Sequence, residues 1–166
     1  LFKGRTMAII PRCTQCGSPY PDSGAPYHCR CGGSFNFLEF PEFVQGGVDP
    51  SHRGLWKYRM MLGLPDNAPE ISLGEGNTPL IDIDLGSRRA FVKLEYQNPT
   101  GSYKDRGSSV LASFLAARSV KSVVEDSSGN AGASLAAYAA RAGMQARIFV
   151  PASASGPKRE QIRQYG

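Results

Sequence analysis

Several features that would remove a chain from the ordinary globular class are missing from this sequence. It contains no run of 18 or more apolar residues, so we expect no membrane-spanning helix and no membrane partner. Its first residues lack the long apolar core of a secretion signal, and no internal repeat or low-complexity tract stands out. Cysteine occurs only within residues 13–31, which argues against a disulfide framework spread through the fold. These absences predict a cytoplasmic globular protein.

Blocks of like charge are also missing, although the formal net charge is +5. Nucleic-acid binding is one interpretation of a net positive charge. Because the basic residues are scattered along the chain, we expect no nucleic-acid partner. A mild positive charge equally suits anionic ligands. With 41% hydrophobic and 20% charged residues, the composition is that of a packed domain, which argues against wholesale disorder.

We expect the 166 residues to form three regions. Residues 1–40 are rich in cysteine, glycine, proline and aromatics, and we expect them to form a small segment of their own. Residues 41–70 read as a linker, in which residues 54–62 are compatible with a short amphipathic helix. Residues 71–166 are expected to fold as α/β structure. Because the chain starts with Leu1 and ends directly after a predicted helix, we expect a partial sequence.

Strands and helices alternate in the last of these regions. We predict strands over residues 90–94, 121–125 and 146–150, and helices over residues 105–118, 130–142 and 158–165. The helix over 105–118 carries its large apolar residues, Val110, Leu111, Phe114 and Leu115, on one side. Such alternation predicts parallel pairing with right-handed crossovers. Since ligands in such sheets bind beyond the carboxyl ends of the strands, the turns that follow the strands are the places to look for chemistry.

Two cysteine pairs lie close together near the start of the chain: Cys13 with Cys16, and Cys29 with Cys31. Four thiolates complete a closed tetrahedral zinc shell, and the arrangement resembles a zinc ribbon, although the second pair is C-x-C. Two disulfides or four free thiols are the alternatives, but a bridge within C-x-C is strained and a reducing cytosol disfavours it. We predict a structural zinc ion, because a closed four-cysteine site has no open position for substrate. So small a region also has little hydrophobic core and needs a cross-link to be stable.

A lysine follows the predicted strand over 90–94. Pro99 and Gly101 predict a turn, and Ser102 can cap the helix that begins near Asp105. Lys104 then lies in the first helical turn, where the positive helix end and partial desolvation disfavour its charged form. A neutral amine can form a Schiff base. From spacing alone, a solvated surface lysine remains the stronger interpretation.

A second small-residue turn follows the strand over 121–125. Residues 127–130 (SSGN) open an alanine-rich helix, and N–H groups at a helix start form a ready anion site. Asn130 could also donate to a phenolate-like oxygen. Simple capping of the helix by serine or asparagine is an equally good interpretation. Together, an amine on one turn and an anion cradle on the other suit a carbonyl cofactor with an amino-acid substrate.

These motifs carry a family resemblance. Residues 73–80 (LGEGNTPL), 93–95 (KLE), 98–107 (NPTGSYKDRG) and 127–130 (SSGN) occur in the order seen in threonine synthase. From Cys13 onwards, the sequence resembles threonine synthase and its close relatives among the fold-type II pyridoxal-phosphate enzymes. The resemblance implies a tryptophan synthase β-like α/β fold with a three-layer parallel sheet, present here only in part. It also implies a small zinc-ribbon-like segment ahead of that fold.

The resemblance assigns roles residue by residue. Lys104 matches the lysine that holds pyridoxal 5′-phosphate and moves protons, and Asn130 matches the asparagine that hydrogen-bonds the cofactor's ring hydroxyl. Ser127, Ser128 and Gly129 match the turn that receives the substrate carboxylate. The implied reaction converts O-phosphohomoserine and water to threonine and phosphate, in an enzyme that is a homodimer when complete.

Departures from the family pattern bear on the substrate. Ala131 stands where threonine synthases commonly have threonine, which removes a hydroxyl from the pocket, and Tyr103 replaces the usual phenylalanine. The glycine-rich loop for the cofactor phosphate and the group that meets the pyridine nitrogen are absent, so we expect the chain alone to bind cofactor poorly.

Two other functions compete with this one. The first is a paralogous pyridoxal-phosphate enzyme, such as a threonine dehydratase-like, diaminopropionate ammonia-lyase-like or sulfur amino-acid enzyme. The second is a non-catalytic zinc-ribbon protein that binds a partner. The run Lys104-Asp105-Arg106-Gly107 favours the synthase over dehydratases, whereas Ala131 favours a divergent relative.

Overall fold

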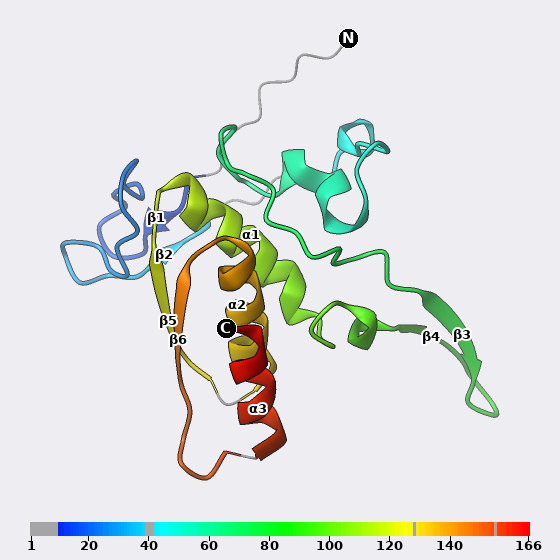
Figure 1. Ribbon diagram of the computed structural model, residues 1–166. Helices are drawn as coiled ribbons and strands as arrows, with labels where there is room; N and C mark the ends of the chain where they lie inside the picture. The colour runs from blue at the N-terminus through cyan, green and yellow to red at the C-terminus, as the bar shows by residue number, and fades with distance from the viewer. Residues whose placement is uncertain (1–9, 39–41, 128, 155) are drawn as a thin grey trace.

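A computed structural model describes residues 10–38, 42–127, 129–154 and 156–166. Three helices lie side by side at its centre, and a pair of strands runs along one side of them (Figure 1). The cysteine segment and a two-stranded hairpin extend to opposite sides of this centre (Figure 1). Among the described helices, none has the length and apolar character needed to cross a membrane.

The α/β part of the chain is built around one crossover. Strand β5 (Ser122–Asp126) pairs in parallel with β6 (Gln145–Phe149), and helix α2 (Asn130–Arg141) connects them. Helix α2 also packs against α1 (Lys104–Ala117) and α3 (Gly156–Tyr165), so it is the central element. The predicted strands and helices after residue 104 are confirmed to within two residues.

Small side chains make this central position possible. Eight consecutive residues of α2, Gly132 to Ala139, are buried, and most of them are alanine, glycine or serine. Gly132 lies so close to its neighbours that an added Cβ would be 2.8 Å from both Ile148 Cγ2 and the Ser127 carbonyl oxygen. The alanine-rich composition therefore lets two helices and two strands approach α2 closely. Gly143, with φ +68°, ends the helix as expected.

Helix α1 buries a different face from the one its apolar residues predict. Its fully buried residues are Asp105, Ser109, Ala112 and Ser113, while Leu111 is 45% exposed. Val110 and Phe114 are only partly buried, against a cluster around Trp56. The apolar residues do lie on one side of the helix, but the most deeply buried residues are polar, because they find hydrogen-bond partners inside the protein.

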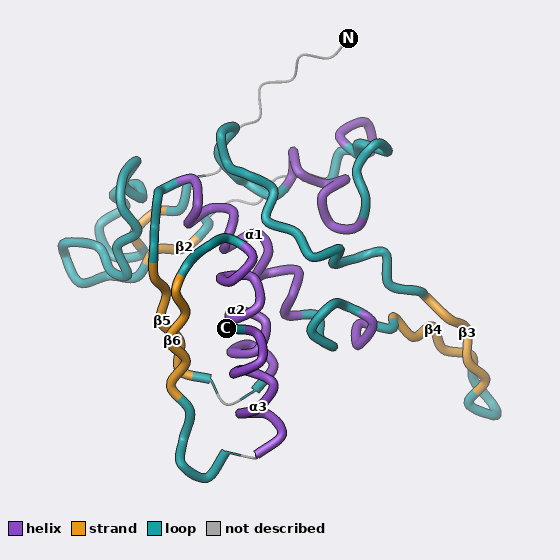
Figure 2. The backbone as a smooth tube through the Cα atoms, in the orientation of Figure 1, coloured by secondary structure: helices purple, strands orange, loops and turns teal. Residues whose placement is uncertain are grey.

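The strand expected over 90–94 does not join the parallel pair. Strand β4 (Arg89–Lys93) pairs antiparallel with β3 (Leu80–Asp84) in a separate hairpin, which Figure 2 shows projecting from the helices. The four intervening residues are too few for the crossover that parallel neighbours need. The turn that carries Lys104 therefore follows a strand of one sheet, and the Ser127–Asn130 turn follows a strand of another. The alternation of strands and helices predicts a single parallel sheet instead.

The remaining described elements are short. Strands β1 (Arg12–Cys13) and β2 (Phe35–Asn36) pair antiparallel in the cysteine segment. The linker contains the 3₁₀ helices η1 (Gln45–Gly47) and η2 (Gly54–Met61), and η3 (Glu95–Gln97) follows the hairpin. The helix expected over 54–62 is thus 3₁₀ and is interrupted at Tyr58, and Trp56 within it is buried.

Candidate functional site

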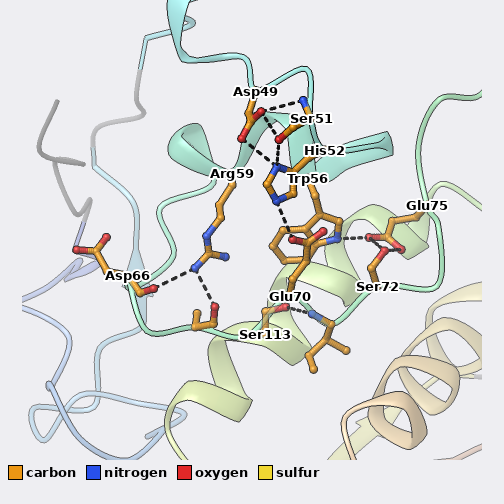
Figure 3. A network of polar contacts seen from close by, with 12 residues as sticks. Asp49, Ser51, His52, Trp56, Arg59, Asp66, Glu70, Ser72, Glu75 and Ser113 are labelled. Atoms are coloured by element: carbon orange, nitrogen blue, oxygen red, sulfur yellow. Dashed lines mark hydrogen bonds and ion pairs between the residues drawn. The ribbon is translucent and has the colours of Figure 1, made fainter. Parts of the chain in front are cut away.

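A buried carboxylate holds together the elements that position the site. Glu75 is 0% exposed and accepts hydrogen bonds from Trp56 Nε1 at 2.7 Å, Ser109 Oγ at 2.6 Å and Tyr138 Oη at 2.7 Å. These donors come from η2, α1 and α2. Figure 3 shows the Trp56 indole and Ser72 directed at the Glu75 carboxylate. One charged side chain thus joins the linker to both helices.

The same contacts fix the ionisation of this group. Burial by itself raises the pKa of the Glu75 carboxyl, but hydrogen bonds from Ser109, Tyr138 and the Leu73 backbone outweigh it and hold the pKa below its usual value. Burial, together with the neighbouring carboxylate, raises the pKa of Tyr138. Glu75 is therefore an ionised carboxylate inside the protein, and Tyr138 is a neutral donor to it.

The side chains of residues 104, 105 and 106 lie in three different environments. Asp105 is 0% exposed and accepts from the Thr100 backbone at 2.7 Å and from Ser134 Oγ at 2.7 Å, so it joins the lysine turn to α2. Arg106 donates to both Glu95 carboxylate oxygens at 2.8 Å, and the Arg106 hydrogen bond lowers the pKa of Glu95 to about 2. Both residues fix the turn from inside.

Lys104 is left free of these internal contacts. It is the first residue of α1, it is half-buried, and the Ser102 hydroxyl accepts from its backbone N–H at 3.2 Å, the capping that the sequence predicts. The Lys104 Nζ lies 4.8 Å from the centre of the Tyr103 ring. Burial raises the pKa of Glu125, near the end of β5, and the charge of Lys104 partly offsets that rise.

The Ser127–Asn130 turn caps α2 with its own side chain. Ser127 Oγ accepts from the backbone N–H of Gly132 at 3.0 Å and of Gly129 at 3.4 Å. Asn130 is exposed, and its Oδ1 accepts from Lys158 Nζ at 2.6 Å. Ser128 lies outside the described residues. Capping, one of the two interpretations of this turn, is thus present in the structure.

The two turns meet through the first turns of α1 and α2. Ser134 lies one helical turn after Asn130 and bonds both Asp105 and Ser108, which follow Lys104. Helix α3 adds a second connection, because Gln161 donates to the Thr100 carbonyl at 3.1 Å while Lys158 donates to Asn130. The structure therefore brings Lys104 and Asn130 to the starts of two adjoining helices.

The four cysteines form a compact cluster at some distance along the chain from these turns. All four are free, and their Sγ atoms lie within 4.8 Å of one another. Two Sγ pairs are closer still, Cys13–Cys31 at 3.4 Å and Cys16–Cys29 at 3.7 Å. Sulfurs bound tetrahedrally to zinc at about 2.3 Å would lie about 3.8 Å apart. The donor set thus fits a zinc ion.

The backbone around the cysteines is folded as two similar turns. Gly17 N–H donates to the Cys13 carbonyl at 2.9 Å and Gly32 N–H to the Cys29 carbonyl at 2.8 Å, and both glycines have positive φ, +71° and +88°. Hydrogen bonding with Ser18 lowers the pKa of Cys16 to about 6, which favours a thiolate. Arg118, at the end of α1, donates to the carbonyls of Pro21 and Gly24 at 2.8 and 2.7 Å and so fixes the segment to the helix.

Sequence patterns alone do not find several residues that hold these turns. Glu75 lies in the motif 73–80, but nothing in its spacing indicates full burial. Lys158 and Gln161 belong to the last helix as ordinary polar residues three apart, which is a common surface spacing. The roles expected for Lys104, Asn130 and Ser127 stay predictions, and the structure shows which residues contact them.

Comparison with known proteins identifies the family. The profile of the pyridoxal-phosphate dependent enzymes matches residues 71–166, more than half of the chain. The chain belongs to this family. It is 35% identical over 153 residues to the threonine synthase of Methanocaldococcus jannaschii, an alignment that covers 86% of this chain and 38% of that protein. It is 42% identical over 106 residues to the threonine synthase of Synechocystis, covering 60% and 28%.

Solved structures give a partial overlap. An O-acetylserine dependent cystathionine β-synthase from Helicobacter pylori superposes with a TM-score of 0.49 and 28% identity, over 55% of this chain and 33% of that chain. The chain spans well under half the length of the curated relatives named above.

The groups at the two helix starts fit the cofactor of the family. Pyridoxal phosphate offers an aldehyde, which a lysine amine can bind, and a ring oxygen, which an amide N–H can meet. Lys104 supplies such an amine. With its Oδ1 engaged by Lys158, Asn130 keeps its Nδ2 hydrogens for donation.

Proposed function

We propose that the chain is the N-terminal part of a threonine synthase, which converts O-phosphohomoserine and water to threonine and phosphate. The observation that carries the proposal is the placement of Lys104, which begins α1 beside the start of α2, while Asp105 is bonded inside the protein and Arg106 is paired with Glu95. The similarity to threonine synthases supports the choice of substrate.

Each residue has a definite task in this proposal. Bound pyridoxal phosphate supplies an electron sink for carbanions. Lys104 holds it by its amine and, once free, carries protons. Asn130 Nδ2 donates to the ring oxygen and holds the ring in one orientation. Ser127, Ser128 and Gly129 receive the substrate carboxylate at the start of α2, where the positive helix end favours an anion.

The cysteine segment has a structural task in the same proposal. Cys13, Cys16, Cys29 and Cys31 hold a zinc ion that has no open position for substrate. Through Arg118, the segment is fixed to the end of α1 opposite Lys104. We also propose that residues 1–40, 41–70 and 71–166 are distinct regions of the chain.

Covalent trapping tests the proposal. The protein as its gene encodes it is incubated with pyridoxal phosphate, reduced with borohydride and analysed by peptide mass spectrometry. We expect the adduct on Lys104, its loss in Lys104→Ala, and its retention in Lys121→Ala, a control that removes an exposed lysine. Labelling on other lysines with none on Lys104 would refute the assignment.

A second assay addresses the substrate. Ala131 lies in the first turn of α2, next to Asn130, and its missing hydroxyl is the feature that favours a paralogous enzyme. We expect phosphate and threonine in equal amounts from O-phosphohomoserine. Formation of a 2-oxo acid and ammonia from threonine, with no release of phosphate, would instead assign a dehydratase-like activity.

A further inference from the structure

One side chain of α3 contacts the amide of Asn130. Lys158, in the first turn of α3, is half-buried and places its Nζ 2.6 Å from Asn130 Oδ1. The same Nζ lies 3.4 Å from Gln161 Oε1. Helix α3 packs against α2, as Figure 1 shows, so this contact joins two helices.

An ammonium group distinguishes the two ends of an amide. An ammonium group can only donate hydrogen bonds. It therefore pairs with the oxygen of an asparagine side chain, which accepts, and not with the NH₂ group, which donates. An exposed asparagine without such a neighbour rotates between both orientations, since water satisfies either end. The Lys158 contact thus leaves Nδ2 as the outward end of Asn130, and that end makes no hydrogen bond to the part of the chain that the structure describes.

The same helix holds the other turn. Gln161 donates from Nε2 to the Thr100 carbonyl at 3.1 Å, and Thr100 belongs to the turn that leads to Lys104. Its Oε1 end faces Lys158 Nζ, so the two side chains fix each other's orientation. A single turn of α3 is therefore in contact with both segments that carry the proposed cofactor residues.

We propose that Lys158 is a positioning residue, which orients the Asn130 amide so that Nδ2 donates to the ring oxygen of the cofactor. This inference rests on the proposed function, in which Asn130 meets that oxygen. Lys158 acts through Asn130 and does not itself touch the cofactor. The prediction that follows is specific: loss of the ammonium group changes the Asn130 side chain even when no cofactor is present.

Nuclear magnetic resonance of the cofactor-free protein tests this directly. The Nδ2 signals of Asn130 are assigned by their loss in Asn130→Asp. In Lys158→Met, which keeps an unbranched apolar stem, we expect these signals to move to the positions of a solvated asparagine. Lys158→Arg, which retains a cationic donor, should restore most of the shift. Arg163→Met, which removes a side chain on α3 that is 75% exposed, should leave the signals unchanged.

Cofactor affinity provides the second readout. We expect the dissociation constant for pyridoxal phosphate to rise about 5- to 10-fold in Lys158→Met, in line with one hydrogen bond made less well, and to recover in Lys158→Arg. Unchanged Asn130 signals in a folded Lys158→Met protein would overturn the positioning role while covalent trapping on Lys104 still stood. If the unaltered protein captures no cofactor on Lys104, the proposed function fails, and this inference fails with it.

Discussion

Replacing Glu75 by glutamine is the sharpest test of how the site is held. Glutamine has nearly the same volume, so the substitution changes charge and hydrogen bonding without opening a cavity. In the structure, Oε1 receives the Trp56 indole N–H at 2.7 Å and Oε2 receives the Leu73 backbone N–H at 3.0 Å. Neither donor can become an acceptor. Whichever way the amide of the new side chain turns, its NH₂ group therefore faces one of these two N–H groups.

The size of the effect follows from this geometry. One buried N–H donor left without an acceptor costs about 1–3 kcal/mol. One of the two hydroxyls, Ser109 on Oε1 or Tyr138 on Oε2, then also faces the NH₂ group and can no longer donate to it, and the other loses its charged partner; each change removes about 1 kcal/mol. We expect Glu75→Gln to lower the free energy of unfolding by about 3–5 kcal/mol, a large share of the stability of a typical domain.

Urea unfolding gives the measurement. Trp56 is the single tryptophan of the chain and lies against Glu75, so its fluorescence reports on this site, and circular dichroism reports on the helices. Glu160→Gln, at an exposed position of α3, is the matched control and should change stability by less than about 0.5 kcal/mol. A loss below about 1 kcal/mol for Glu75→Gln, with cooperative unfolding retained, would refute the reasoning.

A milder variant covers the case in which Glu75→Gln fails to fold. Tyr138→Phe removes one hydroxyl that donates to the carboxylate at 2.7 Å and leaves the ring buried. We expect a loss of about 1.5–3 kcal/mol, the range for a hydrogen bond to a charged group. A neutral effect of this substitution would show that Glu75 is satisfied without Tyr138.

The other predictions concern the charged pair beneath the lysine turn and the cysteines. The Arg106 hydrogen bonds lower the pKa of Glu95 to about 2, so the stability this pair contributes is present above the usual glutamate pKa and is lost as the pH falls from about 4.5 towards 2. Arg106→Gln should flatten that part of a curve of stability against pH, and an unchanged curve would contradict the assignment. Cys16→Ser, or removal of metal by a chelator, should lower the melting temperature without abolishing cofactor capture by Lys104. Loss of capture in a folded Cys16→Ser protein would contradict a purely structural role for the proposed zinc ion.

The sequence by itself determined the order of elements after residue 104. Gly143 ends α2, Ser102 caps α1, and apolar runs between such signals give β5 and β6, because these choices are made by neighbours in sequence. The cysteine spacing likewise anticipated a cluster whose sulfurs lie within 4.8 Å. The motifs also led to the pyridoxal-phosphate family, which the family profile confirms.

Only the tertiary structure decided which face of α1 is buried and which strand β4 joins. Ser109 is buried because it donates to Glu75, and Asp105 is buried because it accepts from Ser134; both partners are distant in sequence. Helical periodicity records apolar residues and cannot register polar groups that find partners across the fold. The contact of Lys158 with Asn130 has the same origin, since 28 residues separate them and only the packing of α3 on α2 brings an ammonium to that amide.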